Sequence, residues 1–154
     1  AGEYTASQFW AELPALFTSA TAFHISEKKI SDLFFRRTND LWEMAEGLAE
    51  LGCDIIVIKR GKDGQLLYDN HSKERWVIPA YPVTILDPTG AGSACCGGFL
   101  AGYRNTYDPL SSVLHGNISA SFCVEGADPF YCMGIMPGLP NARLNALKQM
   151  VKKV

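Results

Sequence analysis

The chain has 154 residues, 47% of them hydrophobic, which is enough for one domain that buries about two thirds of its unfolded surface. Its formal charge of -2 and isoelectric point near 5.9, with dispersed lysines and arginines, argue against nucleic-acid binding. Five cysteines without a C-x-x-C spacing favour reduced thiols over a disulfide framework or a zinc site. Because the chain opens without a basic leader and lacks a run of about 18 apolar residues, we expect a soluble, cytoplasmic protein that does not bind membranes.

The first third of the chain alternates between helical and extended patterns. Apolar residues spaced at about 3.6 predict helices, and short β-branched runs predict strands. The expected elements are a helix from Ser7 to Phe17 broken or restarted at Pro14, a strand over 21–25, a helix from the N-cap Ser26 to Phe35, a helix from the N-cap Asn39 to the cap Gly52, and a strand over 54–59. The strand over 54–59 is almost continuously apolar, which is typical of a parallel strand covered on both faces.

The remaining residues predict more strands and then mainly helices. The expected elements are a turn over 61–64, strands over 65–69 and 75–79 joined by a hairpin connection at 69–72, a strand end over 81–86, a helix over 91–103, a helix over 109–124 ended by 126–129, and a terminal helix over 142–153. No internal repeat or linker interrupts this pattern. We therefore expect a single α/β domain over residues 1–154.

A glycine-rich segment lies where a strand is expected to lead into a helix. It reads Asp-Pro-Thr-Gly-Ala-Gly-Ser over residues 87–93 and continues into the helix over 94–100. Gly90 and Gly92 allow a ligand to approach the backbone, and the first N–H groups of the helix carry its positive dipole end, so this junction favours phosphate. Close packing of a helix on a sheet is the alternative. The dinucleotide fingerprint fits poorly because Cys95 stands at its last glycine, and the P-loop does not fit because no Gly-Lys-Ser/Thr follows.

The longer string over residues 87–100 resembles the C-terminal signature of the ribokinase-like (PfkB) family of carbohydrate kinases. Typical members read Asp-Thr-Thr-Gly-Ala-Gly-Asp-x-x-x-Gly-Gly-Phe-Leu there. Residues 57–64 resemble the family's strand and turn beside the nucleotide, and residues 117–127 resemble its helix and loop near the adenine. The resemblance runs from about Ser7 to Val154, and it implies only the C-terminal, nucleotide-binding half of a family domain, with a mostly parallel sheet flanked by helices.

The resemblance also implies a site and its ligands. ATP, Mg²⁺ and a monovalent cation such as K⁺ are the expected cofactors, and a sugar or related alcohol is the expected acceptor. A homodimer is one assembly consistent with the family, and the oligomeric state stays open. The implied site residues are Gly90, Ala91 and Gly92 as an anion hole for the transferring phosphoryl group, Lys59, Gly61 and Gly64 beside the nucleotide phosphates, Asn117, Gly126 and Ala127 beside the base, and Asp87 at the monovalent cation.

Two positions depart from the family pattern. Ser93 stands where the family has its catalytic Asp, and an unassisted hydroxyl cannot accept a proton near neutral pH. Loss of a general base typically slows a reaction by about 10²- to 10⁴-fold. Lys29 stands where many members have the Glu of an Asn-x-x-Glu motif that supports magnesium. Glu27 could take that role, and a capped, solvated first helical turn is the alternative.

Other polar residues have competing structural explanations. Lys59 and Arg60 lie beside a turn, where charged side chains are usually solvated. Cys95 and Cys96 suit buried positions at a helix start, because adjacent cysteines form a disulfide only with strain. The three histidines lack the spacing of a metal site.

The residues thus favour one function and leave a second open. The first is an ATP-dependent phosphotransferase that transfers the γ-phosphate to a sugar or similar hydroxyl, impaired because Ser93 replaces the base. The alternative is a non-catalytic pseudokinase that binds nucleotide, sugar phosphate or a protein partner, since anion binding needs the glycine segment but not the carboxylate. An oxidoreductase with a Rossmann site is disfavoured.

Overall fold

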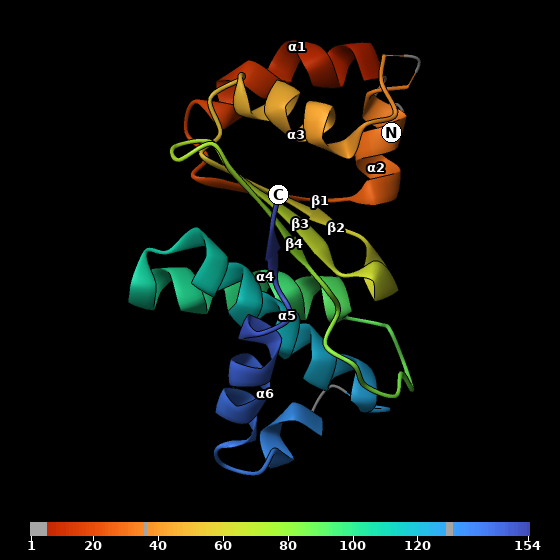
Figure 1. The fold of residues 1–154 in the computed structure, drawn as a ribbon. Helices are drawn as coiled ribbons and strands as arrows, with labels where there is room; N and C mark the ends of the chain where they lie inside the picture. The colour runs from red at the N-terminus through yellow and green to blue at the C-terminus, as the bar shows by residue number, and fades with distance from the viewer. Residues whose placement is uncertain (1–5, 36, 129–130) are drawn as a thin grey trace.

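The computed structural model describes residues 6–35, 37–128 and 131–154 as a three-layer α/β arrangement (Figure 1). The helices α1, α2 and α3 cover one face of a sheet, and α4, α5 and α6 lie on the other side. In chain order the elements are α1 (Ala6–Phe17), β1 (Ala22–Ser26), α2 (Glu27–Leu33), α3 (Leu41–Ala49), β2 (Ile55–Lys59), the 3-10 turn η1 (Gly61–Asp63), β3 (Gln65–Asp69), β4 (Glu74–Ile78), α4 (Ala91–Thr106), α5 (Pro109–Glu125), the 3-10 turn η2 (Tyr131–Gly134), α6 (Leu139–Lys148) and β5 (Lys152–Lys153). The predicted α/β class is confirmed.

The sheet is mixed, which corrects the expectation of a mostly parallel one. Its order is β1-β2-β3-β4-β5, and only β1 and β2 are parallel, with Ala22 opposite Ile55. The connections explain this. Two helices separate β1 from β2, whereas η1 and a short hairpin join β2, β3 and β4, and connections that short can link only antiparallel neighbours.

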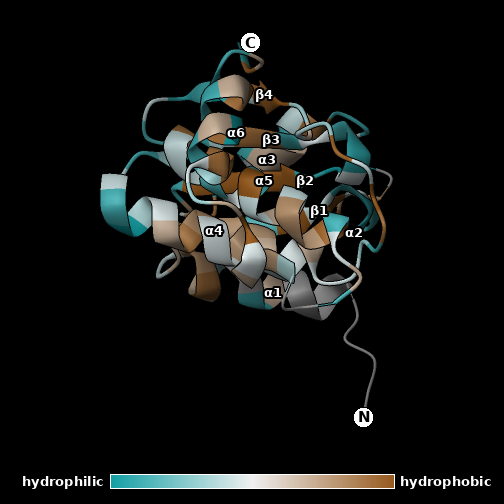
Figure 2. Ribbon diagram, turned by 90° about the horizontal axis from the view of Figure 1, so that it is seen from below, coloured by the Kyte–Doolittle hydropathy of each residue, from teal (hydrophilic) through white to brown (hydrophobic). Residues whose placement is uncertain are grey.

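Strand β2 divides the interior into two cores. Ile56 and Ile58 pack into the cluster beneath α1, α2 and α3, while Ile55 and Val57 pack into the cluster with α4, α5 and α6. This division follows from the two-residue period of a strand. All four side chains are buried, as the apolar run predicted, and Figure 2 shows the hydrophobic colour concentrated in the strands.

Three helix boundaries differ from the sequence-based expectations. Helix α1 runs through Pro14 without a break, and the Thr18 N–H donates to the Pro14 carbonyl at 3.1 Å. Asp40, not Asn39, is the N-cap of α3, because its carboxylate accepts the Trp42 N–H at 2.8 Å. Ser26 caps α2 as predicted, and α2 ends at Leu33.

Two segments expected to be regular are organised by tertiary contacts instead. Residues 81–86 form no strand; they belong to the long connection between β4 and α4. The terminal helix ends at Lys148, and Lys153 pairs with Trp76 as part of β5. The Lys153 ammonium also contacts the Glu74 carboxylate and lies 5.5 Å from the Trp76 ring centre. These contacts with β4 explain why the helical pattern does not continue to the end.

Helices α4 and α5 meet at backbone contact through glycines. A Cβ on Gly98 would lie 2.3 Å from Ser119 Oγ and 2.7 Å from the His115 carbonyl, and a Cβ on Gly116 would lie 2.6 Å from the Cys95 carbonyl. Side chains at these positions would push the helices apart. Glycine here therefore fixes where the N-terminus of α4 lies relative to α5.

Gly97 and Gly98 allow a matched test of this packing. Gly98→Ala should lower the free energy of unfolding by about 1–3 kcal/mol, because the added methyl overlaps Ser119. Gly97→Ala should raise it by about 0.5–1 kcal/mol, since a Cβ there meets nothing within 4 Å and alanine is the better helix former. Urea unfolding followed by circular dichroism measures both. Equal effects of the two substitutions would contradict the packing explanation.

Candidate functional site

The N-terminus of α4 has the geometry of an anion site. Gly90 is its N-cap with φ of 84°, a conformation that strains other residues. The Ala94 N–H closes the first helical turn on the Gly90 carbonyl at 2.9 Å, and the Ala91 N–H donates to the Pro88 carbonyl at 3.2 Å. The N–H groups of Gly92 and Ser93 precede the first intrahelical donor. The Ala91 N–H is therefore engaged by Pro88, whereas among the described residues the N–H groups of Gly92 and Ser93 have no backbone acceptor. The anion hole over Gly90, Ala91 and Gly92 stays a prediction.

The loop before α4 is tied to the end of α5. The Asp87 carboxylate accepts the Thr89 N–H at 2.8 Å, and this bond lowers the pKa of Asp87. The N–H groups of Leu86 and Asp87 donate to the Val124 carbonyl at 2.8 and 3.2 Å, and Cys123 Sγ contacts the Thr89 carbonyl at 3.4 Å. Asp87 thus shapes the turn, whether or not it also meets a cation.

Two other predicted residues follow α5 directly. Gly126 ends the helix, and a Cβ there would lie 2.3 Å from the Tyr131 Cβ, so the Tyr131 side chain packed against it requires glycine at this position. Ala127 is exposed. Since Val124 holds the loop before α4, both residues lie near the same end of the site.

Lys59 brings a positive charge to α4. It ends β2, and a Cβ on Gly92 would lie 3.6 Å from its Nζ. The same Nζ lies 3.7 Å from Cys96 Sγ. Arg60 points elsewhere, because its Nε pairs with Glu27 at 3.3 Å. Lys59 therefore lies beside the glycine segment, and Arg60 does not. The prediction that Lys59 meets nucleotide phosphates stays a prediction.

The glycines of the β2–β3 turn differ in role. Gly61 has φ of 57° and nothing lies within 4 Å of its Cβ position, so its backbone is open to a ligand. Gly64 has φ of 85°, and a Cβ there would lie 2.1 Å from the Ile78 carbonyl. Close packing against the end of β4 is sufficient to explain Gly64.

Asn117 lies in the interior and not at the site. Its amide nitrogen donates to the Pro79 carbonyl at 3.0 Å and to Gln65 Oε1 at 3.3 Å, and its oxygen accepts the Tyr81 N–H at 3.1 Å. Gln65 Nε2 in turn lies 2.8 Å from Cys95 Sγ. Asn117 thus anchors the connection after β4, and its contacts do not support the prediction that it borders a base. The sequence offered no spacing that pairs Gln65 with Asn117.

Ser93 lies exposed at the third position of α4. Within the described ranges, no hydrogen bond joins its hydroxyl to a histidine or carboxylate. The structure therefore shows nothing that would convert this hydroxyl into a proton acceptor.

A cavity of about 440 Å³ lies beside β1 and α2. Its lining consists of Phe23, His24, Ile25, Ser26, Lys29, Asp32, Leu33 and Lys59. The Lys29 N–H donates to Ser26 Oγ at 3.4 Å, so the first turn of α2 has an ordinary N-cap. Lys29 also lines the cavity. Lys59 belongs both to this cavity and to the N-terminus of α4. We call the cavity the β1 pocket.

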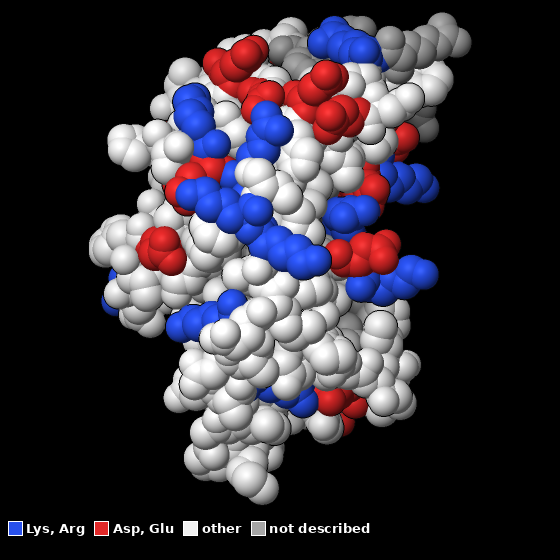
Figure 3. Space-filling view, viewed as in Figure 1, with Lys and Arg blue, Asp and Glu red and all other residues white. Residues whose placement is uncertain are grey.

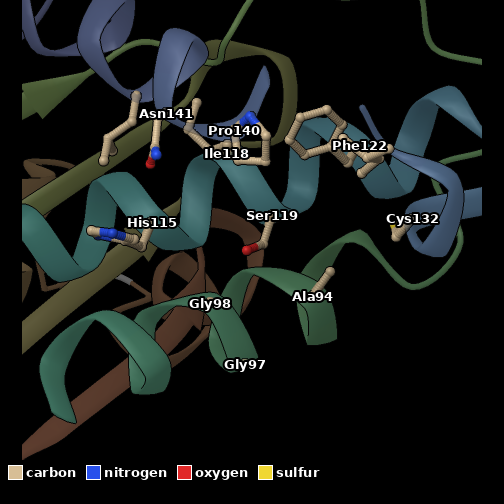
Figure 4. Close-up of a pocket in the computed structure, with 12 residues that line it drawn as sticks. Ala94, Gly97, Gly98, His115, Ile118, Ser119, Phe122, Cys132, Pro140 and Asn141 are labelled. Carbon is tan, nitrogen blue, oxygen red and sulfur yellow. The ribbon is translucent and has the colours of Figure 1, made fainter. Parts of the chain in front are cut away.

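A second cavity of about 460 Å³ lies between α4, α5 and α6 (Figure 4). Apolar side chains and the α4 glycines form most of its wall, with His115, Ser119 and Asn141 as polar groups. None of the predicted site residues lines it.

His24 is the residue of the β1 pocket that sequence reasoning did not select. Its ring stands edge-on to Phe99 with centres 4.5 Å apart, and both ring nitrogens are buried without a hydrogen-bond partner among the described residues. Burial, with Lys59 as a second cause, lowers the pKa of His24 to about 4. The ring is therefore neutral at pH 7.

The depressed pKa of His24 predicts a pH-dependent stability. The unfolded state takes up a proton near pH 6.5 and the folded state only near pH 4, so the stabilisation is complete above pH 6.5 and is lost as the pH falls towards 4. The loss should be on the order of 3 kcal/mol. Urea unfolding at a series of pH values measures this loss. In His24→Leu, the free energy of unfolding should change less between pH 6.5 and pH 4 than in the unsubstituted chain. The exposed His71→Gln variant serves as the control and should keep the slope.

Comparison with known proteins identifies the family. The model of the pfkB family of carbohydrate kinases matches residues 4–133, so the chain belongs to this family. It is 30% identical over 135 residues to the 5-dehydro-2-deoxygluconokinase of Clostridium tetani, covering 88% of this chain and 36% of that protein. It is 42% identical over 71 residues to the cytidine kinase of Thermococcus kodakarensis, covering 46% of this chain and 26% of that protein.

The fold agrees with this family. The ribokinase of Thermotoga maritima superimposes with a TM-score of 0.72 at 24% identity, covering 86% of this chain and 44% of that structure. The predicted ribokinase-like fold is confirmed. The chain thus spans less than half the length of each of these three proteins. In the part of the chain that the structure describes, no helix has the length and apolar character to span a bilayer.

Proposed function

We propose that the chain provides the nucleotide-binding part of an ATP-dependent phosphotransferase that acts on a sugar or related alcohol. The observation that carries this proposal is the position of Lys59 Nζ beside Gly92, at the end of α4 where Gly90 opens the backbone. A helix N-terminus with an ammonium group beside it favours phosphate. Kinase relatives in the same family support the reaction class.

The geometry suits phosphoryl transfer, which depends mainly on positioning and electrostatic stabilisation. Charge in the transition state spreads over the equatorial oxygens of the phosphoryl group. The N–H groups of Gly92 and Ser93 and the ammonium of Lys59 are fixed donors that would stabilise this charge without reorganisation. The acceptor hydroxyl must also lose its proton, and Ser93 offers no base for it. We therefore expect slow transfer by the chain as it stands.

The described residues fit the expected cofactors unequally. The open turn at Gly61, Lys59 and the α4 N-terminus suit a nucleotide. Mg²⁺, which would neutralise phosphate charge, finds less support, because Glu27 pairs with Arg60 and Lys29 carries the wrong charge. Asp87 could contribute its carboxylate to a monovalent cation beyond its bond to Thr89.

A non-catalytic role is the second candidate, and the exposed, unactivated Ser93 favours it. In that role the donors of α4 bind a nucleotide or sugar phosphate, and no proton needs to be removed. The two candidates differ in whether turnover returns when a carboxylate is restored.

Ser93→Asp separates the two candidates. ATP binding with magnesium is measured by calorimetry, and phosphate transfer is assayed with ribose, fructose, cytidine and sugar acids. Restoring the carboxylate should raise turnover by at least about tenfold, since a general base contributes about 10²- to 10⁴-fold. Ser93→Ala is the control and should leave turnover unchanged.

The outcomes separate clearly. Nucleotide binding without recovery of turnover in Ser93→Asp favours the non-catalytic role. Absence of nucleotide binding contradicts the phosphotransferase, and absence of both nucleotide and sugar-phosphate binding contradicts both candidates. Because the chain spans only part of its relatives, the same substitution should also be assayed in a longer protein that includes an N-terminal half.

A further inference from the structure

The β1 pocket combines cations with little compensating negative charge. Lys29 and Lys59 both line it, and Asp32 is the single carboxylate among its lining residues. Within residues 6–35, 37–128 and 131–154, neither lysine forms an ion pair with a carboxylate. The nearby Glu27 pairs with Arg60 instead. Two ammonium groups around one cavity repel each other unless an anion lies between them.

Hydrogen-bond donors in the pocket point to the same ligand. The His24 ring nitrogens are buried without a partner among the described residues, and a buried polar group left unpaired is costly. Because neither ring nitrogen is accessible to solvent, His24 contributes a neutral wall to the pocket rather than a donor to a ligand. The Ser26 hydroxyl already accepts the Lys29 N–H, so its own hydrogen is available for donation. The pocket therefore supplies two ammonium groups and the Ser26 hydroxyl as a neutral donor.

We propose that the β1 pocket binds a phosphate or carboxylate group directly through Lys29 and Lys59, without a divalent cation. Divalent metals in phosphate sites are usually held by one or two carboxylates together with the phosphates. Here the pocket is lined by one carboxylate, Asp32, and two lysines, so the ammonium groups would neutralise the charge of the bound anion. A volume of about 440 Å³ leaves room for a small organic anion.

The position of the pocket limits what carries this anion. Lys59 also adjoins Gly92 at the proposed phosphate site, so the bound group lies next to the transferring phosphate. The carrier is then either an acceptor alcohol with its own acidic group or the terminal phosphate of the nucleotide. This choice rests on the proposed function, whereas the binding of an anion by the lysines does not.

Lys29 and Lys28 provide a matched pair for the test. Both are exposed residues of α2, and only Lys29 lines the pocket. Calorimetric titrations of the chain with inorganic phosphate, gluconate and ADP are performed in EDTA, and the ADP titration is repeated with magnesium. We expect anion binding in EDTA that Lys29→Glu weakens by at least about tenfold, because a charged contact becomes repulsive. Lys28→Glu should change it by less than about twofold.

The pattern of effects identifies the carrier. Loss of gluconate binding in Lys29→Glu with ADP binding retained assigns the pocket to an acidic acceptor. If Lys29→Glu loses ADP binding in EDTA, and neither the unsubstituted chain nor a variant binds gluconate, the pocket is assigned to the nucleotide phosphate. Circular dichroism confirms that each variant is folded.

Two results would overturn the inference: no anion binding in EDTA, or equal weakening by the Lys28 and Lys29 substitutions. If ADP still binds with magnesium in either case, the proposed function stands without the inference. Conversely, phosphate binding that depends on Lys29 without any ADP binding supports the inference and contradicts the proposed function.

Discussion

The contact between α4 and α5 at their glycines is the constraint on which the rest of the site depends. Gly98 and Gly116 remove the side chains that would separate the two helices. The backbone of α4 is thereby fixed against α5, whose last turn also holds the Leu86 and Asp87 N–H groups. One packing interaction thus positions both the N-terminus of α4, which we propose binds a phosphate, and the loop that leads into it. A shift of that interface would move the donors of Gly92 and Ser93 together.

Charge is distributed unevenly over the fold, and this shapes the chemistry available to it. On the face that Figure 3 shows, Lys, Arg, Asp and Glu side chains gather over the sheet and the α1–α3 layer, while the surface over α4, α5 and α6 is mostly uncharged. The positive end of α4 faces Lys59 from this sparsely charged layer. In the proposed function, the helix dipole and the lysine would act on the same ligand.

The sequence predicted the fold class and the order of most elements, but it did not predict that Lys59 lies beside the glycine segment. The predicted features depend on the local periodicity of apolar residues and on the glycine-rich segment over residues 87–100, which is specific to one family. It could not predict the direction of each strand pairing, the interior role of Asn117 or the closeness of His24 to Lys59. Each of these depends on which elements meet in space: Asn117 meets Gln65 across the core, and the parallel pairing of β1 with β2 places His24 opposite Val57. The N-cap of α3 was missed by one position, because Asn39 and Asp40 are both good caps and only Asp40 has its oxygen at the Trp42 N–H.

Lys59 is shared by the N-terminus of α4 and the β1 pocket, and this links the two thermodynamically. A single ammonium has three N–H donors and one positive charge, so an anion at either place changes the charge felt by an anion at the other. By linkage, any such effect is reciprocal and of equal size in both directions. Two separate anions would then weaken each other's binding. One ligand that bridges both places would instead bind Lys59 with both of its parts, and no second anion would compete for the same ammonium.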